Sequence, residues 1–330
     1  MPTGLWGEGR IRRPSPFERL GVTMGEYTPD STFRIVFDSD PRNEFEPDGG
    51  VTMSVNALGL RGPDVARTKP PGTFRVLGLG DSFTFGVGVP DEQTFLRRLE
   101  SSLREAPDST AFEVLNAGVQ GYNTRDEVTV FEQRWIHLQP DLVVLTFYLN
   151  DAYSDAAFWN MGQGLGIHLQ QPDGLAQVSV LADLVQHAWR ARGVQRKMKE
   201  HYDQHYFQDG NAFLASDAQD APFRVDWGVS RAALERARDL TREKDIQFAV
   251  VLFPELHALN EDYPFQAIHD VVGEACRELD IPLLDLFETF RGHDASSLWV
   301  HPSDHHPNGE AHRLAAASIE AFLRREKLLP

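Results

Sequence analysis

Residues 74–86, which read FRVLGLGDSFTFG, decide the fold of this chain. An apolar run typical of a buried strand ends at Gly80, and Asp81 and Ser82 follow before another glycine and an amphipathic segment. We expect Ser82 on the tight turn between this strand and the next helix, where its hydroxyl and unpaired backbone N–H groups face one point. Acyl transfer needs both features, a nucleophile and donors for the negative charge that develops.

Apolar runs continue to alternate with amphipathic stretches along the rest of the chain. The pattern predicts strands at 74–79, 112–115, 142–147, 248–253 and 282–284, and helices at about 94–104, 124–137, 229–243, 264–279 and 308–327. Several of these strands are continuously apolar, as expected of parallel strands that are buried on both faces. The sequence therefore predicts an α/β fold with a doubly wound, parallel five-stranded sheet and helices on both faces.

Two segments depart from this alternation. Residues 1–72 are rich in Pro, Gly and Asp, and we expect them to form an N-terminal extension packed on a main domain at 73–330. Residues 153–225 carry clustered aromatic and histidine side chains and are predicted to be an insertion after the third strand, beside the ligand crevice. The aromatic residues at 201–207 either grip a sugar or acyl chain or form the insertion's own core.

Composition limits the partners. The chain has 330 residues and a formal net charge of -17, which argues against nucleic acid or anionic membrane, because both need a positive field. No apolar run is long enough to span a bilayer, and the first residues lack the apolar block of a secretory signal. We therefore expect a cytoplasmic protein, with export by a leader outside this sequence as the alternative. The lone Cys276 allows no disulfide within the chain, and no oligomeric state is predicted.

Three further motifs fall where chemistry is expected. Residues 116–123 (NAGVQGYN) follow the second predicted strand, residues 148–151 (YLND) follow the third, and residues 299–308 (WVHPSDHHPN) precede the last helix. In a doubly wound sheet the carboxyl ends of the strands converge on one crevice, so residues distant in sequence become neighbours there.

Together with Gly80-Asp81-Ser82, these motifs resemble the SGNH, or GDSL-type, hydrolase superfamily, in the same order and from about residue 73 to 327. The resemblance implies a flavodoxin-like sheet and a serine esterase or acyltransferase that uses no cofactor and no metal. It also implies roles for five residues: Ser82 as nucleophile, His306 as general base, Asp304 as the acid that orients it, and the Ser82 N–H, the Gly118 N–H and the Asn150 amide as oxyanion donors.

These residue types suit the chemistry. A serine hydroxyl is a poor nucleophile until a base removes its proton, and histidine titrates near neutrality. A carboxylate fixes the histidine tautomer and stabilises the imidazolium that forms. An asparagine amide donates a hydrogen bond without carrying a charge that would quench the base.

Two positions depart from the family pattern. The family usually has glycine where this chain has Tyr148, which either narrows the acyl pocket or reaches the substrate. The family's acid usually lies three residues before the histidine, where this chain has Ser303. Asp304 lies two residues before His306, and in extended backbone such residues point the same way. A Ser82–His306 dyad helped by a backbone carbonyl is the alternative.

Each motif also has a simpler interpretation. Ser82 alone could cap the next helix, and Asp81 is expected to hydrogen-bond the turn rather than to transfer protons. The histidines 301, 305 and 306 with Asp304 resemble a metal cluster, but no motif elsewhere completes a site. Arg61 either lines the crevice or pairs with surface carboxylates, and we favour the second.

The sequence thus predicts a serine esterase that acts on short-chain acyl esters, with O-acetyl esters, including those on carbohydrate, as the substrates that family analogy suggests. An O-acyltransferase that uses the same acyl-enzyme is the first alternative. A carbohydrate-binding protein that keeps the fold without the chemistry is the second.

Overall fold

A computed structural model describes residues 2–6, 26–37, 39–40, 42–105, 110–152, 227–260, 262–302 and 304–330. The predicted insertion at 153–225, with its aromatic residues, lies outside the described residues, and so does Ser303. In the described part of the chain, no helix is long and apolar enough to cross a lipid bilayer.

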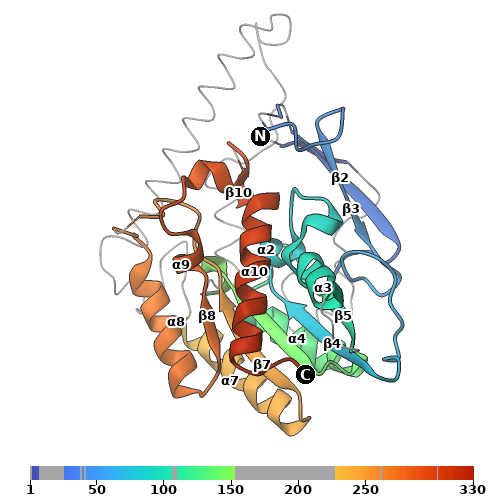
Figure 1. Ribbon diagram of the computed structural model, residues 1–330, viewed down its shortest axis with the longest axis vertical. Coiled ribbons are helices and arrows are strands. Elements are labelled where there is room, and N and C mark those ends of the chain that lie inside the picture. Colours follow the sequence, from blue (N-terminus) through green and yellow to red (C-terminus); the bar gives the residue numbers. More distant parts are fainter. Residues whose placement is uncertain are drawn as a thin grey trace, which may run out of the picture.

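A parallel sheet of five strands forms the centre of the described structure (Figure 1). Its strand order is β5 (Ala111–Asn116), β4 (Thr73–Leu79), β6 (Leu142–Phe147), β7 (Gln247–Leu252) and β8 (Leu283–Asp285), and all neighbours pair in parallel. This is the doubly wound sheet that the sequence predicts, in the flavodoxin-like order that the family resemblance implies. The chain reverses its direction of winding beside β4, so the carboxyl end of β4 is the switch point where such sheets bind ligands.

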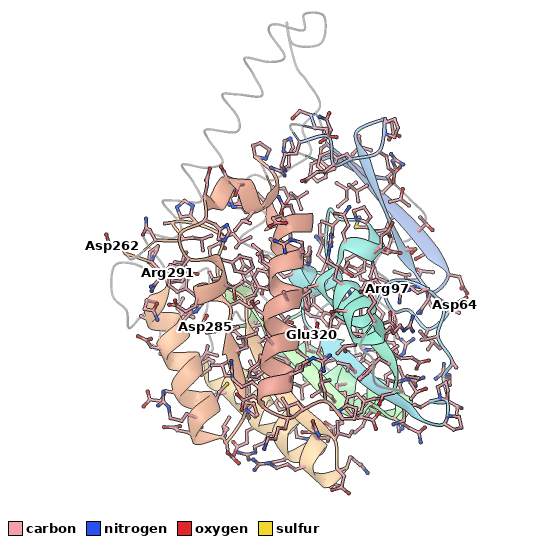
Figure 2. All side chains as sticks on the ribbon, viewed as in Figure 1. Asp64, Arg97, Asp262, Asp285, Arg291 and Glu320 are labelled. Carbon is pink, nitrogen blue, oxygen red and sulfur yellow. The ribbon has the colours of Figure 1, made fainter. Side chains whose placement is uncertain are left out.

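Helices cover both faces of the sheet. α3 (Phe95–Glu105) and α10 (Gly309–Arg325) pack together on one face, and α4 (Thr124–Gln133) and α7 (Trp227–Glu243) pack together on the other (Figure 1). α8 (Gln266–Glu278) packs against β7 and β8. Glu320, labelled on α10 in Figure 2, accepts a hydrogen bond from Ser102 Oγ of α3 at 2.6 Å. The predicted helix at 124–137 ends at Gln133 and continues as a 3-10 turn at Trp135–Leu138.

The core follows from the apolar strands. All six residues of β6 are buried, as expected of a central parallel strand with helices on both faces. On α3 the buried side chains of Phe95, Leu99 and Leu103 recur every four residues and form the stripe that faces the sheet.

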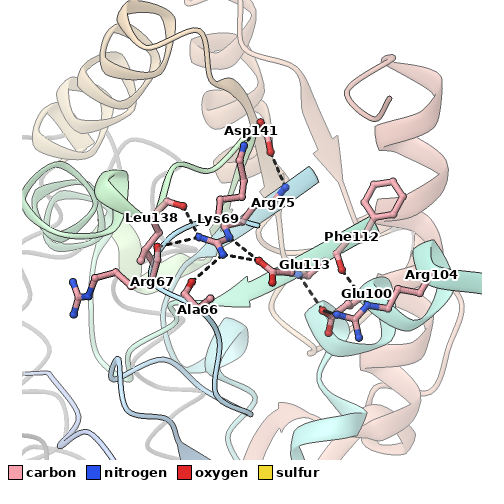
Figure 3. Close-up of polar contacts among 11 residues, drawn as sticks. Ala66, Arg67, Lys69, Arg75, Glu100, Arg104, Phe112, Glu113, Leu138 and Asp141 are labelled. Atoms are coloured by element: carbon pink, nitrogen blue, oxygen red, sulfur yellow. Dashed lines mark hydrogen bonds and ion pairs between the residues drawn. The ribbon is translucent and has the colours of Figure 1, made fainter. Parts of the chain in front are cut away.

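The Arg75 cation is buried near the amino ends of the strands (Figure 3). The Arg75 side chain on β4 is fully buried and donates to Glu113 Oε2 on β5 from Nε at 2.8 Å and from Nη2 at 2.6 Å. It also donates to the carbonyls of Leu138 at 2.6 Å and Ala66 at 2.9 Å. Removal of one partner from a buried ion pair typically costs about 3–5 kcal/mol. Because Arg75 needs these partners, its bonds also hold the segment at Ala66 on the sheet.

A smaller antiparallel sheet precedes the main one. β1 (Pro2–Trp6), β2 (Ser31–Phe37) and β3 (Gly50–Val55) pair in that order. The alternate residues of β2 are buried, in agreement with a strand that packs one face on a core. Phe33 of β2 stacks on Phe85 with ring centroids 5.5 Å apart, so this sheet contacts the segment after β4. The boundary at residue 72 between an extension and a main domain stays a prediction.

Candidate active site

Ser82 begins a four-residue helix, α2 (Ser82–Phe85), directly after β4. Asp81 is the N-cap, because its Oδ1 accepts a hydrogen bond from the Phe83 N–H at 2.8 Å. The simpler interpretation of Ser82 as the cap is therefore wrong, and Asp81 has the turn-forming role expected of it. Gly80 has φ 154°, and a Cβ there would lie 2.0 Å from Thr84 Oγ1, so the turn needs glycine at this position.

The Ser82 side chain is buried at the switch point of the sheet. Its hydroxyl donates to Asp81 Oδ2 at 3.3 Å. In the described part of the chain its backbone N–H meets no acceptor, as expected for the first residue of a helix. A hydroxyl and an N–H without an acceptor thus lie on one residue.

The histidine predicted to be the base lies on a short strand opposite this turn. β10 (Asp304–Pro307) pairs with β9 (Trp299–His301), and the rings of His306 and Phe83 lie 5.5 Å apart. Asp304 Oδ1 lies 2.5 Å from His306 Nδ1 and also accepts the His306 backbone N–H at 3.1 Å. Asp304, two residues before the histidine, therefore reaches it, and the partner of Nδ1 is this carboxylate rather than a backbone carbonyl.

The environments of His306 and Asp304 shift the pKa values of these two residues in opposite directions. Burial lowers the pKa of His306, but the charge and hydrogen bond of Asp304, with the charges of Asp81 and Glu255, outweigh it and raise that pKa above 6.5. Burial raises the pKa of Asp304, but the charge and hydrogen bonds of His306 outweigh the effect of burial and lower this pKa below its usual value. The neighbouring His305 differs, since burial lowers its pKa to about 4. Of the two histidines, His306 is thus the one with a carboxylate on one ring nitrogen.

Asn150 comes to the same place from the end of β6. It lies in the 3-10 turn Leu149–Ala152, and its Nδ2 donates to Asp81 Oδ2 at 2.8 Å. Asp81 therefore receives hydrogen bonds from the Phe83 N–H, the Ser82 hydroxyl and the Asn150 amide. This carboxylate holds Ser82 and Asn150 side by side, and the amide keeps a second N–H for another acceptor.

The loop after β5 carries two glycines, of which Gly118 packs against α2. Gly118 is needed for packing, because a Cβ there would lie 2.3 Å from the Phe85 backbone nitrogen. Its N–H donates to Asn116 Oδ1 at 3.0 Å, so this predicted oxyanion donor already has an acceptor. Gly121 has φ 84° and is half-buried, and its N–H meets no acceptor within the described residues. The second glycine of residues 116–123 is the signal that could have indicated it.

Tyr148 and Glu255 complete the surroundings of the candidate base. The Tyr148 ring stacks on Phe83 with centroids 3.9 Å apart, and its hydroxyl donates to Glu255 Oε2. Glu255 follows β7, is 1% exposed and adds negative charge near His306. Nothing in its local sequence indicates this position, apart from its place after the carboxyl end of a strand.

A family comparison agrees with this geometry. The model of the GDSL-like Lipase/Acylhydrolase family matches residues 79–314. The chain belongs to this family. The match covers the turn at Ser82, the loops that carry Gly118 and Asn150, and the strand of His306, so the family resemblance found in the sequence is confirmed. Acyl-ester hydrolysis is accordingly the general activity of the chain.

Several solved structures are similar to this chain at low sequence identity. A lipolytic protein of the G-D-S-L family from Desulfitobacterium hafniense DCB-2 is 13% identical, with a TM-score of 0.45 over 76% of this chain and 100% of its own. The acetyl xylan esterase AlAXEase is 14% identical, with a TM-score of 0.46 over 75% of this chain and 98% of its own. The lipase/acylhydrolase from Enterococcus faecalis is 14% identical, with a TM-score of 0.44 over 77% and 97%. The comparison with curated proteins gave no significant match.

Arg61 is more deeply buried than the sequence analysis led us to expect. Its side chain is 1% exposed and pairs with Asp91 Oδ1 at 2.5 Å, and its guanidinium lies 4.6 Å from the centre of the Phe85 ring. The predicted pairing with a carboxylate is thus present, but the arginine is buried rather than at the surface. Arg61 lies beneath α2, where its Nη2 also donates to the Val89 carbonyl at 2.7 Å.

The remaining histidines of the 299–308 motif have other partners. His301 Nε2 lies 2.8 Å from Ser39 Oγ, and the His305 ring stacks on Trp299 with centroids 3.8 Å apart. Within the described ranges no group of three or more His, Cys, Asp or Glu is arranged to hold a metal ion. Cys276 is buried on α8, and burial raises the pKa of its thiol to about 12.

Proposed function

We propose that the protein is a serine esterase that hydrolyses short-chain acyl esters, with Ser82 as nucleophile, His306 as general base and Asp304 as the acid that orients it. One observation carries the proposal. His306 is bonded to the Asp304 carboxylate, and its ring lies beside Phe83, the residue that follows Ser82 at the N-terminus of α2. This arrangement supplies an activated nucleophile and backbone donors at one point.

The reaction begins with a turn of the serine hydroxyl. Ser82 Oγ rotates from Asp81 toward His306 Nε2, which takes its proton as Oγ attacks the ester carbonyl carbon. The tetrahedral intermediate collapses when His306 returns the proton to the leaving alcohol and the carbon–alkoxy bond breaks. Water then attacks the acyl-enzyme, with His306 again as base, and releases the carboxylic acid and free Ser82. Asp304 stabilises the imidazolium in both halves of the reaction.

Three donors stabilise the oxyanion in this proposal. They are the Ser82 N–H, the second N–H of Asn150 and one N–H from the loop after β5. The sequence predicts Gly118 for the third position, where its N–H would turn from Asn116 Oδ1 toward the substrate oxygen. Gly121 is the second candidate for that donor, because its N–H is without an acceptor in the described chain. Loss of one such donor typically costs about 10²–10³ in rate.

Tyr148 supports a short acyl group. Its ring stacks on Phe83 immediately after the nucleophile and is held by Glu255. An aromatic ring fixed at both ends leaves less room beside Ser82 than a smaller residue would. We therefore propose O-acetyl and similarly short esters of small molecules or carbohydrates as substrates.

Turnover of a chromogenic ester tests the proposal. Wild-type protein should hydrolyse p-nitrophenyl acetate, Ser82→Ala should not, and Ser101→Ala, an exposed serine on α3, should match wild type. Analysis of the products with added acceptor alcohols separates hydrolysis from acyl transfer. Turnover by Ser82→Ala equal to that of wild type would remove the nucleophile from the proposal.

A further inference from the structure

Three carboxyl groups are buried together behind Asn150. Asp81 is 0% exposed, Asp151 is 1% exposed and Glu127 is 2% exposed. They come from three elements: the cap of α2, the 3-10 turn after β6 and the first turn of α4. The proposed mechanism uses Asp81 to hold Ser82 and Asn150, and it assigns no role to the other two.

Asp151 closes the turn that carries Asn150. Its Oδ2 accepts the Tyr148 N–H at 2.6 Å, and its own N–H donates to the Tyr148 carbonyl at 3.0 Å. Its Oδ1 accepts the Thr124 hydroxyl at 3.1 Å, which ties the turn to the start of α4. Each oxygen of Asp151 thus receives a donor, as an ionised carboxylate prefers.

Glu127 has no such donors. Neither of its carboxyl oxygens meets a hydrogen-bond donor within the described chain, yet its side chain is in hydrogen-bond contact with Asp151. Two ionised carboxylates in contact have no proton to share, and they repel each other strongly in a buried site that excludes water. One of the two must therefore carry a proton, and Asp151 already accepts on both oxygens.

We propose that Glu127 is a protonated carboxylic acid whose O–H donates to Asp151 and thereby positions Asn150 in the oxyanion site. Glu127 is a positioning residue, since it acts through Asp151 and does not touch substrate. The part of this inference that concerns catalysis rests on the proposed function. The proton on Glu127 does not, because burial and the lack of donors argue for it independently.

The surrounding charges agree with this assignment. Burial, together with the charges of Asp151, Asp81 and Asp126, raises the pKa of Glu127 well above 4.5. Because the folded-state pKa is raised, the proton leaves only as the pH rises through that raised value. Loss of this proton would leave the Glu127 and Asp151 carboxylates facing each other as two anions near Asp81. Their repulsion would displace the turn that carries Asn150. The rate should then fall on the alkaline side.

The first test needs no activity. We would label the glutamate side-chain carboxyls with ¹³C and follow their NMR shifts with pH in wild type, Glu127→Gln and Glu132→Gln. Glu132 lies on the same helix and pairs with Arg236 at the surface. A carboxyl signal that is still protonated at neutral pH, is lost in Glu127→Gln and is kept in Glu132→Gln supports the proposal. A spectrum in which Glu127→Gln removes only an ionised carboxyl overturns it.

The second test measures kcat against pH for the ester that the enzyme turns over. Glu127→Gln keeps a donor to Asp151, so kcat at neutral pH should stay within about twofold and the alkaline decline should disappear. Glu127→Leu removes the donor and should lower kcat about tenfold or more with little change in KM, in protein whose folding is checked by thermal unfolding. An alkaline decline that persists in Glu127→Gln overturns the positioning role. If wild type hydrolyses no ester, the proposed function fails, while the NMR result still decides the proton.

Discussion

Replacement of Asp304 by asparagine should slow the enzyme by about 10²-fold and change its pH profile. The carboxylate oxygen lies 2.5 Å from His306 Nδ1, with side-chain exposures of 12% for Asp304 and 23% for His306. A hydrogen bond to a charged group contributes about 1.5–3 kcal/mol. At about 1.36 kcal/mol per factor of ten, this is about 10- to 150-fold in rate. A variant amide that turns its NH₂ toward Nδ1 would also select the wrong tautomer, which can raise the loss to about 10⁴.

The pH profile provides a second reading of the same variant. The base works when neutral, so kcat/KM should fall as the pH drops through the pKa of His306. Asp304 is the main group that raises this pKa, against the effect of burial. Asp304→Asn should therefore move the acid limb of kcat/KM to lower pH, in addition to lowering the plateau.

A matched control is present in the same chain. Asp285, labelled in Figure 2, pairs with His269 Nδ1 at 2.8 Å at the end of β8. Asp285→Asn breaks the same kind of pair and should leave kcat and the acid limb unchanged. The assay is initial-rate hydrolysis of p-nitrophenyl acetate across pH for both variants. If Asp304→Asn keeps more than half of the wild-type kcat and the same acid limb, Asp304 does not orient the base.

Three further predictions concern the support of the site. Tyr148→Ala should raise the ratio of kcat/KM for hexanoyl esters to kcat/KM for acetyl esters about tenfold, because a pocket contact is worth about 1–3 kcal/mol. An unchanged dependence of kcat/KM on acyl chain length would contradict this prediction. Tyr27→Phe removes the hydroxyl that accepts the Gln120 N–H at 3.2 Å. Because Gln120 lies in the loop after β5 that supplies an oxyanion donor in the proposal, kcat should fall about 2- to 12-fold while thermal melts show a folded protein. Gly118→Ala should lower the free energy of unfolding by about 1–3 kcal/mol, because its Cβ meets backbone at 2.3 Å, whereas Gly273→Ala, whose Cβ on α8 finds only Leu283 at 3.8 Å, should raise it by up to about 1 kcal/mol.

The fold could be predicted because its information is local. The apolar run of β6 is buried along its whole length, and every strand boundary predicted from such runs lies within one residue of the structure. The last helix, predicted to begin at about 308, is capped by Asn308, which accepts the N–H groups of Glu310 at 3.1 Å and Ala311 at 3.0 Å. Capping and hydrophobic periodicity depend on neighbours in sequence, which a single chain displays.

The parts that could not be predicted depend on tertiary contacts. Arg61 has no local pattern that separates a surface ion pair from a buried cation. Tertiary contacts decide between them: Phe33 of β2 stacks on Phe85, and Ser54 of β3 donates to Asp91, the partner of Arg61. Glu255 and Glu127 lie in unremarkable surroundings in the sequence, yet the fold brings one near His306 and the other behind Asn150. For Gly118 the sequence does not indicate the direction of its N–H, which the Asn116 side chain fixes.

The most direct test of the central claim is intact-mass spectrometry after exposure to a fluorophosphonate. Wild type should gain a single adduct, and Ser82→Ala and His306→Ala should each gain none, with Ser101→Ala labelled like wild type. An adduct that requires both residues would establish an activated serine at the end of β4. Labelling that persists in well-folded Ser82→Ala, or no labelling of well-folded wild type, would contradict the account.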